Sequence, residues 1–202
     1  MENKQKLQND EFYQKGVSLY KKKNYDYAIE LLSGFLQKNP GFTECRHYLW
    51  DAIRQKNILN KPPLTTLALQ KLKIFFIHFS LILFQIKKDT TAAEKTIHDI
   101  LMINPSNVPI LFKLAHLYIT QDKKEEAIST LEELLKLDRE NLPALKILAT
   151  TYYTNKSYEK AKIIATKILN IDPRYLPAEN ILKDISAIGT IEKGFDDIKP
   201  AT

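Results

Sequence analysis

The sequence predicts an all-α protein, and three observations lead to that fold class. Hydrophobic residues make up 44% of the 202 residues and charged residues 27%, a balance that favours a folded globular chain. Five glycines and nine prolines leave little room for the many turns of a β-sandwich. Lys, Glu, Leu and Ile dominate, and no segment sustains the alternation of apolar and polar residues that indicates a strand.

The chain also repeats itself. Three alanines and three aromatic residues recur at intervals of 34 residues, at Ala93, Ala127, Ala161, Phe84, Tyr118 and Tyr152. Pro105 and Pro173 close two of these repeats, and Arg139 occupies the matching position between them. An upstream tract with Ala28 and Pro40 fits the same frame. A fixed period of this length predicts stacked helical repeats.

This pattern resembles the tetratricopeptide repeat, a helix–turn–helix unit of the same period. The family pattern has a small residue and then an aromatic one in its first helix, and an alanine in its second. The tracts "LAHLY…EEAISTLEELL" and "LATTYY…EKAKIIATKIL" supply these residues. Gly16, Ala115 and Ala149 occupy the small position, whereas Leu81 departs from it. The resemblance implies a right-handed α-solenoid of tetratricopeptide helix–turn–helix repeats.

The expected organisation is one continuous domain of five repeats followed by a closing helix and a tail. The boundaries are 1–42 for the N-terminal repeat, 43–73 for an irregular repeat, 74–107, 108–141 and 142–175 for three further repeats, 176–189 for the capping helix and 190–202 for a flexible tail. The capping helix spans about residues 177–187, and its polar outer face would keep the end of the array soluble.

The irregular repeat is the main departure from the frame. Its first helix is expected over residues 43–56, but its second half has no second-helix signature and contains Pro62 and Pro63. Because proline suits the first turn of a helix, we expect an atypical helix from about Pro63. The sequence leaves open whether this segment fills the partner-binding groove or forms one long helix with residues 74–87.

The resemblance also implies where a partner binds. In this family, extended peptides or partner helices occupy a concave groove lined mainly by the first helices of the repeats. The matching positions in this chain are Tyr13, Tyr20, His47, Phe75, His78, Ile82, Gln85, Phe112, His116, Lys146 and Tyr153. Their mixture of aromatic, aliphatic and scattered polar groups suits an amphipathic helix or an apolar peptide.

These residues predict a non-enzymatic scaffold or adaptor that binds another protein, with a chaperone as one version. Family members that clamp a carboxylate tail have Lys and Asn where this chain has Tyr13 and Val17, so that activity is not carried over. Two alternatives stay open at the third repeat: its groove face is covered by the chain's own residues 57–72, or it pairs with a second copy of the chain.

Other classes of function find less support. The sequence contains no glycine-rich phosphate loop, no HExxH and no Gly-x-Ser-x-Gly turn, so we expect no enzyme. We expect no metal or other cofactor, because histidines on three separate repeats would not converge on one ion. The net charge of +6 comes mostly from lysine rather than from the arginine that recognises phosphates and guanine edges, which argues against nucleic-acid binding.

A membrane-associated assembly factor, anchored by the apolar residues 64–86, is the alternative function. Residues 74–86 alone are too short for a span of ~20 residues, and the longer stretch places Lys71 and Lys73 near its middle, at ~2.5–3.5 kcal/mol each. The repeat frame also needs residues 74–87 as a first helix. With a single cysteine, Cys45, and no secretory signal in "MENKQKLQND", we expect a cytoplasmic protein.

Overall fold

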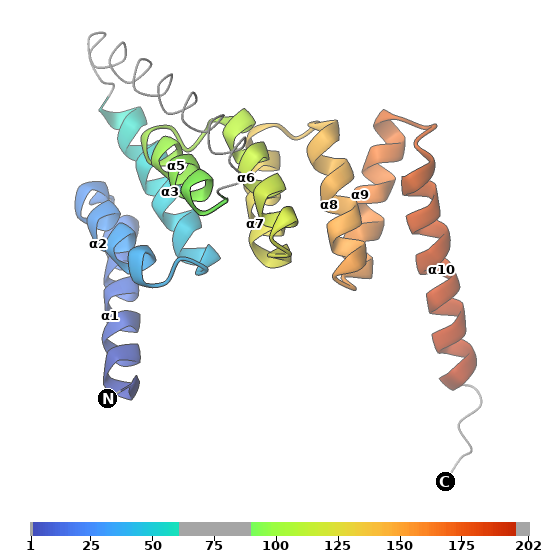
Figure 1. Cartoon of the computed structure of the whole chain (residues 1–202), viewed down its shortest axis with the longest axis horizontal. Helices are drawn as coiled ribbons and strands as arrows, with labels where there is room; N and C mark the ends of the chain where they lie inside the picture. Colours follow the sequence, from blue (N-terminus) through green and yellow to red (C-terminus); the bar gives the residue numbers. More distant parts are fainter. Residues whose placement is uncertain (1, 61–89, 197–202) are drawn as a thin grey trace. The chain divides into compact units, whose positions relative to one another are not determined.

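The computed structural model describes residues 2–60 and 90–196, and all regular structure in these ranges is α-helical. This confirms the all-α class (Figure 1). The helices are α1 (Glu2–Lys21), α2 (Tyr25–Lys38), α3 (Thr43–Leu59), α5 (Thr90–Ile103), α6 (Val108–Thr120), α7 (Lys124–Leu137), α8 (Leu142–Thr154), α9 (Tyr158–Ile171) and α10 (Leu176–Asp196).

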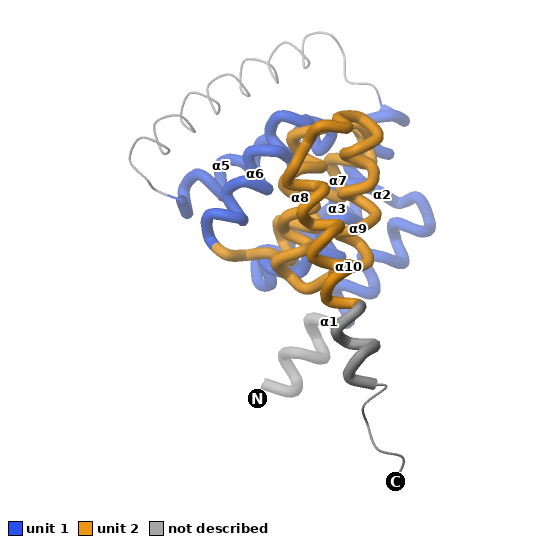
Figure 2. Tube along the Cα trace, turned by 90° about the vertical axis from the view of Figure 1, so that its right-hand side faces the viewer, with its two compact units in different colours: residues 1–121 blue, residues 122–202 orange. Residues whose placement is uncertain are grey.

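The chain divides into two compact units, an N-terminal unit of residues 1–121 and a C-terminal unit of residues 122–202 (Figure 2). In the N-terminal unit α1 packs on α2 and α3, α2 packs on α3, α3 packs on α5 and α5 packs on α6. In the C-terminal unit α8 packs on α7, α9 and α10, and α9 packs on α10. Within each unit, helices therefore pack mainly on their neighbours along the chain, as stacked repeats do.

Two helices that lie one repeat period apart begin with the same capping residues. Asn107 and Asn141, 34 residues apart, precede α6 and α8. Each side-chain oxygen accepts a hydrogen bond from a backbone N–H of the first turn, at 3.3 Å from Ile110 and at 3.1 Å from Ala144. Each helix also has a proline in its first turn, where no N–H is needed. Both the asparagine cap and the proline favour the start of a helix at this position.

The repeated alanines form the inner seam of the helix pairs. Ala28, Ala127 and Ala161 are fully buried, and Ala93 is nearly so. In the first pair, Gly16 of α1 lies so close to α2 that a Cβ atom there would stand 2.8 Å from Leu32 Cδ2. Small residues therefore let the two helices of a repeat approach closely, as the spacing predicts.

Two features differ from the expected boundaries. The helix α10 does not end near Ala187 but continues to Asp196, so it is longer than the predicted capping helix. Gly189, Thr190 and Gly194 are weak helix formers, but no proline follows until Pro200, so no residue breaks the helix near its predicted end. The other difference is at α3, which packs directly on α5, the second helix of the following predicted repeat.

The boundary between the predicted repeats 43–73 and 74–107 lies outside the described residues, and so do the atypical helix and the apolar residues 74–86. In the ranges 2–60 and 90–196, no helix combines the length and the hydropathy that crossing a bilayer requires.

Candidate functional site

The predicted partner-binding residues of α1 lie in an aromatic cluster. Tyr13 is only 7% exposed, and its ring packs on Phe35 and Phe42, with centroids 5.5 Å and 5.0 Å away. Tyr20 packs edge-on against Tyr48 of α3, with the centroids 5.4 Å apart. Tyr13 therefore offers almost no surface to a partner, because it holds α1, α2 and the start of α3 together.

The hydroxyl of Tyr20 forms a hydrogen bond within the chain. It donates a hydrogen bond to the Asp51 carboxylate on α3, and this bond, with burial, raises the pKa of Tyr20 to about 12. Asp51 also pairs with Arg54, at 3.5 Å. His47, on the same helix, is half-buried and has contacts within the chain.

Phe112 and His116 are brought together in one pocket. They stand one turn apart on α6 and line a pocket of about 270 Å³ between α5 and α6. Ala93, Ile97, Lys113, Leu117 and Thr120 complete its lining. Phe112 is half-buried and His116 is exposed, so both side chains can be reached from solvent. The pocket is mainly apolar with a polar rim.

The two predicted residues of α8 contact α9, α10 and the loop between these helices. Lys146 Nζ lies 3.5 Å from Asp172 Oδ2 and 3.9 Å from the ring centroid of Tyr175. The Tyr153 hydroxyl donates a hydrogen bond of 3.2 Å to Asp184 Oδ2. Both side chains are half-buried, and their contacts connect α8 to the last loop and helix of the C-terminal unit. The remaining predicted residues, Phe75, His78, Ile82 and Gln85, lie outside the described residues.

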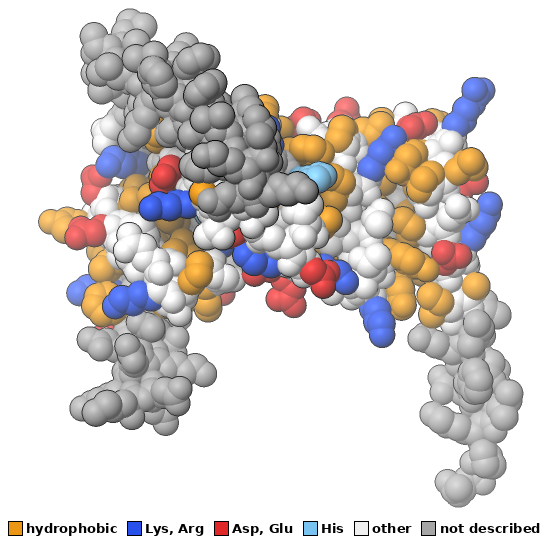
Figure 3. All heavy atoms as spheres, viewed as in Figure 1, with side chains coloured by type: hydrophobic (Ala, Val, Ile, Leu, Met, Phe, Trp, Pro, Cys, Tyr) orange, Lys and Arg blue, Asp and Glu red, His pale blue; other side chains and the backbone are white. Residues whose placement is uncertain are grey.

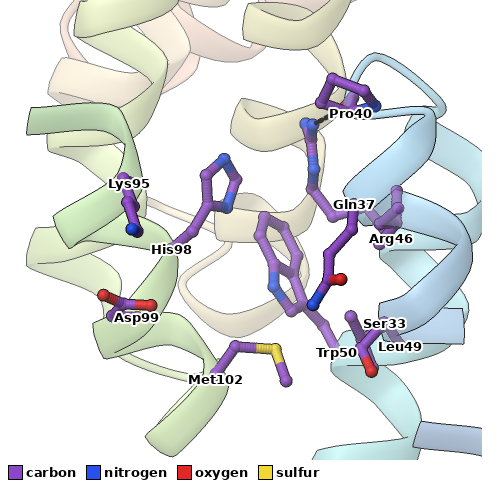
Figure 4. A pocket seen from close by; sticks show the side chains of 11 residues that line it. Ser33, Gln37, Pro40, Arg46, Leu49, Trp50, Lys95, His98, Asp99 and Met102 are labelled. Carbon is purple, nitrogen blue, oxygen red and sulfur yellow. Dashed lines mark hydrogen bonds between the residues drawn. The ribbon is translucent and has the colours of Figure 1, made fainter. Parts of the chain in front are cut away.

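A second pocket, which the repeat pattern does not predict, lies between α2, α3 and α5 (Figure 4). It encloses about 380 Å³ and is lined by Ser33, Leu36, Gln37, Pro40, Arg46, Leu49, Trp50, Lys95, His98, Asp99 and Met102. The sequence carries a signal for it: Arg46, Leu49 and Trp50 are three and four residues apart, so an arginine shares a helix face with apolar residues. A charged residue on an apolar face marks either a structural anchor or a binding site.

Two sequence models of the tetratricopeptide repeat match the chain, one over residues 12–41 and the other over residues 86–146. The chain is a tetratricopeptide repeat protein. The matched ranges contain α2 and the second half of α1 in the first case, and α5, α6 and α7 in the second.

Solved structures of tetratricopeptide repeat domains share the fold at low sequence identity. The TPR domain of P58(IPK) has a TM-score of 0.60 and 14% identity, covering 95% of this chain and 68% of its own. The first TPR of Spaghetti (RPAP3), bound to the HSP90 peptide SRMEEVD, has a TM-score of 0.51 and 18% identity, covering 59% of this chain and 94% of its own. No curated protein sequence matches the chain.

In terms of the tetratricopeptide repeat, the α5–α6 pocket lies where the second helix of one repeat meets the first helix of the next. The helix α5 contributes Ala93 and Ile97 to the lining of this pocket. The helix α6 contributes the other lining residues, among them Phe112 and His116. The α2–α3–α5 pocket lies beside the first helix of the irregular repeat, where α3 packs on α5.

Cys45 is fully buried on α3, and burial raises the pKa of its thiol to about 12, which keeps it protonated and unreactive at neutral pH. Across residues 2–60 and 90–196 no cluster of three or more His, Cys, Asp or Glu side chains could hold a metal ion. On the face drawn in Figure 3, lysine and arginine side chains are scattered among acidic ones.

Proposed function

We propose that this tetratricopeptide repeat protein is a non-enzymatic interaction scaffold that binds a helix or an extended apolar peptide of a partner protein. The observation that carries the proposal is the pocket between α5 and α6. Phe112 and His116, which the family resemblance assigns to the partner-binding face, both line it. Its volume of about 270 Å³ is just below the range of small-molecule sites, which suits one apolar side chain of a partner.

Two further points support a protein partner. The first TPR of Spaghetti (RPAP3), which shares this fold, is bound to a peptide. The rim of the pocket carries Lys113 and the exposed His116, which can fix the orientation of a peptide whose apolar residue enters between Ala93 and Ile97. Scaffolds of this kind also act as chaperones for apolar segments, and we propose that role in the cytoplasm, where the single thiol of Cys45 stays reduced.

A selection from a library of displayed helical and extended peptides tests the proposal. We expect the purified protein to enrich peptides with one large apolar residue flanked by polar ones. The affinity of an enriched peptide should fall by about tenfold or more for Phe112→Ala, because loss of a central aromatic contact typically costs more than about 1 kcal/mol.

The matched control is Ile163→Ala, which shortens an apolar side chain that is 66% exposed on α9 and should leave the affinity unchanged. Thermal unfolding of each variant verifies that the fold is kept. Selection without any enriched peptide, or enriched peptides that bind Phe112→Ala as well as the unmodified protein, would show that the α5–α6 pocket does not bind a partner.

A further inference from the structure

Arg46 is a buried cation that has no anionic partner among residues 2–60 and 90–196. The residue is only 4% exposed, and one terminal nitrogen of its guanidinium donates a hydrogen bond to the Pro40 carbonyl. The guanidinium carbon lies 5.5 Å from the ring centroid of Tyr118. The other terminal nitrogen, Nη1, is buried and has no hydrogen-bond partner in the described part of the chain. Neither the Pro40 carbonyl nor the Tyr118 ring neutralises the charge.

No ion pair joins Arg46 to a carboxylate among residues 2–60 and 90–196. A buried guanidinium in this state is costly, because charged groups inside proteins are normally paired as well as hydrogen-bonded. Tertiary packing alone does not explain an arginine here, since a long apolar side chain could cover the same surface without that cost. The arrangement therefore points to an anion that arrives from outside the described part of the chain.

Arg46 also lines the pocket between α2, α3 and α5, so such an anion has a place to enter (Figure 4). Lys95 and His98 lie on the α5 side of the same pocket, and His98 Nε2 lies 3.1 Å from the hydroxyl of Tyr118, whose ring faces the guanidinium. Asp99 is the only acidic residue among the described residues that line the pocket. Two full positive charges therefore face one negative charge.

The rest of the lining is apolar enough to hold more than a bare ion. Trp50 and His98 point toward one another across the pocket from α3 and α5, and Leu36, Leu49 and Met102 add apolar surface (Figure 4). The volume of about 380 Å³ falls within the range of small-molecule sites, which are mostly apolar with a few placed polar groups. A hydrated inorganic anion would leave these walls without contact.

We propose that this pocket binds an organic carboxylate with an apolar body, with the Arg46 guanidinium as its ion-pair partner and Trp50 as its apolar wall. A carboxylate offers Nη1 an acceptor and can bind a guanidinium through two parallel hydrogen bonds. This site is separate from the α5–α6 pocket and does not depend on the proposed scaffold function. The carboxylate can belong to a free small acid or to an acidic side chain of a bound protein.

The only tryptophan of the chain, Trp50, makes the test direct. Titration with hexanoate should change the intrinsic fluorescence of Trp50 in a saturable way. Hexanamide, which has the same apolar body without the charge, should bind at least about tenfold more weakly, because a charge-assisted hydrogen bond is about twice as strong as a neutral one. Equal responses to both compounds, or no saturable response to hexanoate at millimolar concentration, would overturn the proposal.

Substitutions locate the charge. Arg46→Gln should weaken hexanoate binding by about tenfold or more. Because Arg46 also contacts Pro40 and Tyr118, this variant is first tested for folding by circular dichroism and thermal unfolding. Lys95 and Asp99 are exposed and can be changed without disturbing the core.

We expect Lys95→Gln to weaken binding and Asp99→Asn to tighten it, each by about two- to threefold, since each removes one partly screened charge. The matched control is Lys183→Gln, which removes the same charge from an exposed side chain of α10 and should leave hexanoate binding unchanged. If Lys95→Gln and Asp99→Asn leave the affinity unchanged or shift it in the opposite directions, the pocket does not select an anion and the proposal fails.

A second pair of probes separates the two sources of carboxylate. The capped peptides acetyl-Leu-Glu-Leu-amide and acetyl-Leu-Gln-Leu-amide differ only in one side-chain charge. Hexanoate binding without a preference between the peptides supports a free small acid, whereas preference for the Glu peptide supports an acidic side chain of a protein. The peptide pair is compared only when hexanoate binds more tightly than hexanamide, because the proposal fails without that preference.

Discussion

In the described part of the chain, three residues other than glycine hold a left-handed backbone conformation just after a helix ends. They are Lys23, Asp122 and Lys156, with φ angles of 60°, 56° and 58°. This conformation places the Cβ atom of an ordinary residue close to the following carbonyl and costs roughly 1–2 kcal/mol, which glycine avoids. Each position ends a helix and starts a tight turn, so the strain is a cost of the short connection.

We therefore predict that Lys156→Gly stabilises the protein by about 0.5–1 kcal/mol, because the relief of strain exceeds the extra flexibility of the unfolded chain. Lys162→Gly, in the exposed interior of α9, should instead destabilise it by about 1 kcal/mol through loss of helix propensity. Urea unfolding of both variants measures the two signs. Destabilisation by both substitutions would show that the turn at Lys156 carries no relievable strain.

Tyrosine hydroxyls in the helix interfaces donate to carboxylates. Tyr20 donates to Asp51 and Tyr152 donates to Glu132, and both tyrosine pKa values are raised. For Tyr20 the pKa rises to about 12, first through this hydrogen bond and then through burial. The protonated form is thus held more tightly in the folded state than in the unfolded state, where the pKa is about 10.

This difference fixes the sign of a pH effect. The stability contributed by Tyr20 is fully present below pH ~10 and is lost as the pH rises toward 12. We expect Tyr20→Phe to be less stable than the unmodified protein at neutral pH and to lose less stability between pH 10 and 12. Tyr27→Phe, at a side chain that is 62% exposed, is the control and should follow the unmodified protein. Parallel alkaline stability curves for Tyr20→Phe and the unmodified protein would contradict this assignment.

At the scale of helices, the 34-residue spacing predicted which residues face inward. The buried Ala127 and Ala161 stand where the repeat requires them, and so does the nearly buried Tyr118. The spacing could not show that α3 packs directly on α5, because a period fixes the positions of helices along the chain and not which helices touch. The end of α10 was missed for a local reason: Gly189 lowers helix propensity without breaking the helix.

In the candidate sites, too, some features follow from the repeat spacing and others depend on contacts between helices. The placement of Phe112 and His116 one turn apart on α6 follows from the repeat frame, and their role in binding stays a prediction, whereas the burial of Tyr13 could not be predicted. Its ring is covered by Phe42, which lies in the loop before α3 and outside the period. The pocket at Arg46 was missed because it depends on the contact between α3 and α5.

The close packing of α1 on α2 yields a prediction with an internal control. Gly16→Ala would place a Cβ atom 2.8 Å from Leu32 Cδ2 and 2.9 Å from Leu32 Cγ, and Leu32 is fully buried with no room to move. Overpacking of this kind costs about 1–3 kcal/mol and should exceed the gain of about 1 kcal/mol in helix propensity.

Gly34→Ala, in α2, is the control, because no atom lies within 4 Å of its added Cβ. It should stabilise the protein by about 0.5–1 kcal/mol. Chemical denaturation of both variants compares the same substitution in two surroundings. If Gly16→Ala is stabilising, α1 and α2 are not held at the close distance that the structure shows.

For the whole molecule, stability should be distributed locally. Within each compact unit the helices pack mainly on their neighbours in the chain, so each repeat depends on the repeats beside it more than on distant ones. Such chains open in parts, with free energies that differ from one region to another. A substitution in the core of one unit therefore weakens the helices around it without unfolding the rest.

Hydrogen exchange followed by mass spectrometry can measure this. Leu148, on α8, is 1% exposed, and Leu148→Ala should cost about 2–5 kcal/mol. Because α8 packs on α7, α9 and α10, amide protection should fall in these helices while the protection of α1 and α2 stays unchanged. Leu32→Ala, on α2, is the reciprocal variant and should lower protection in α1, α2 and α3 but not in α9. An equal loss of protection in both units for either variant would mean that the chain unfolds as a single cooperative body, and the local account of its stability would then be wrong.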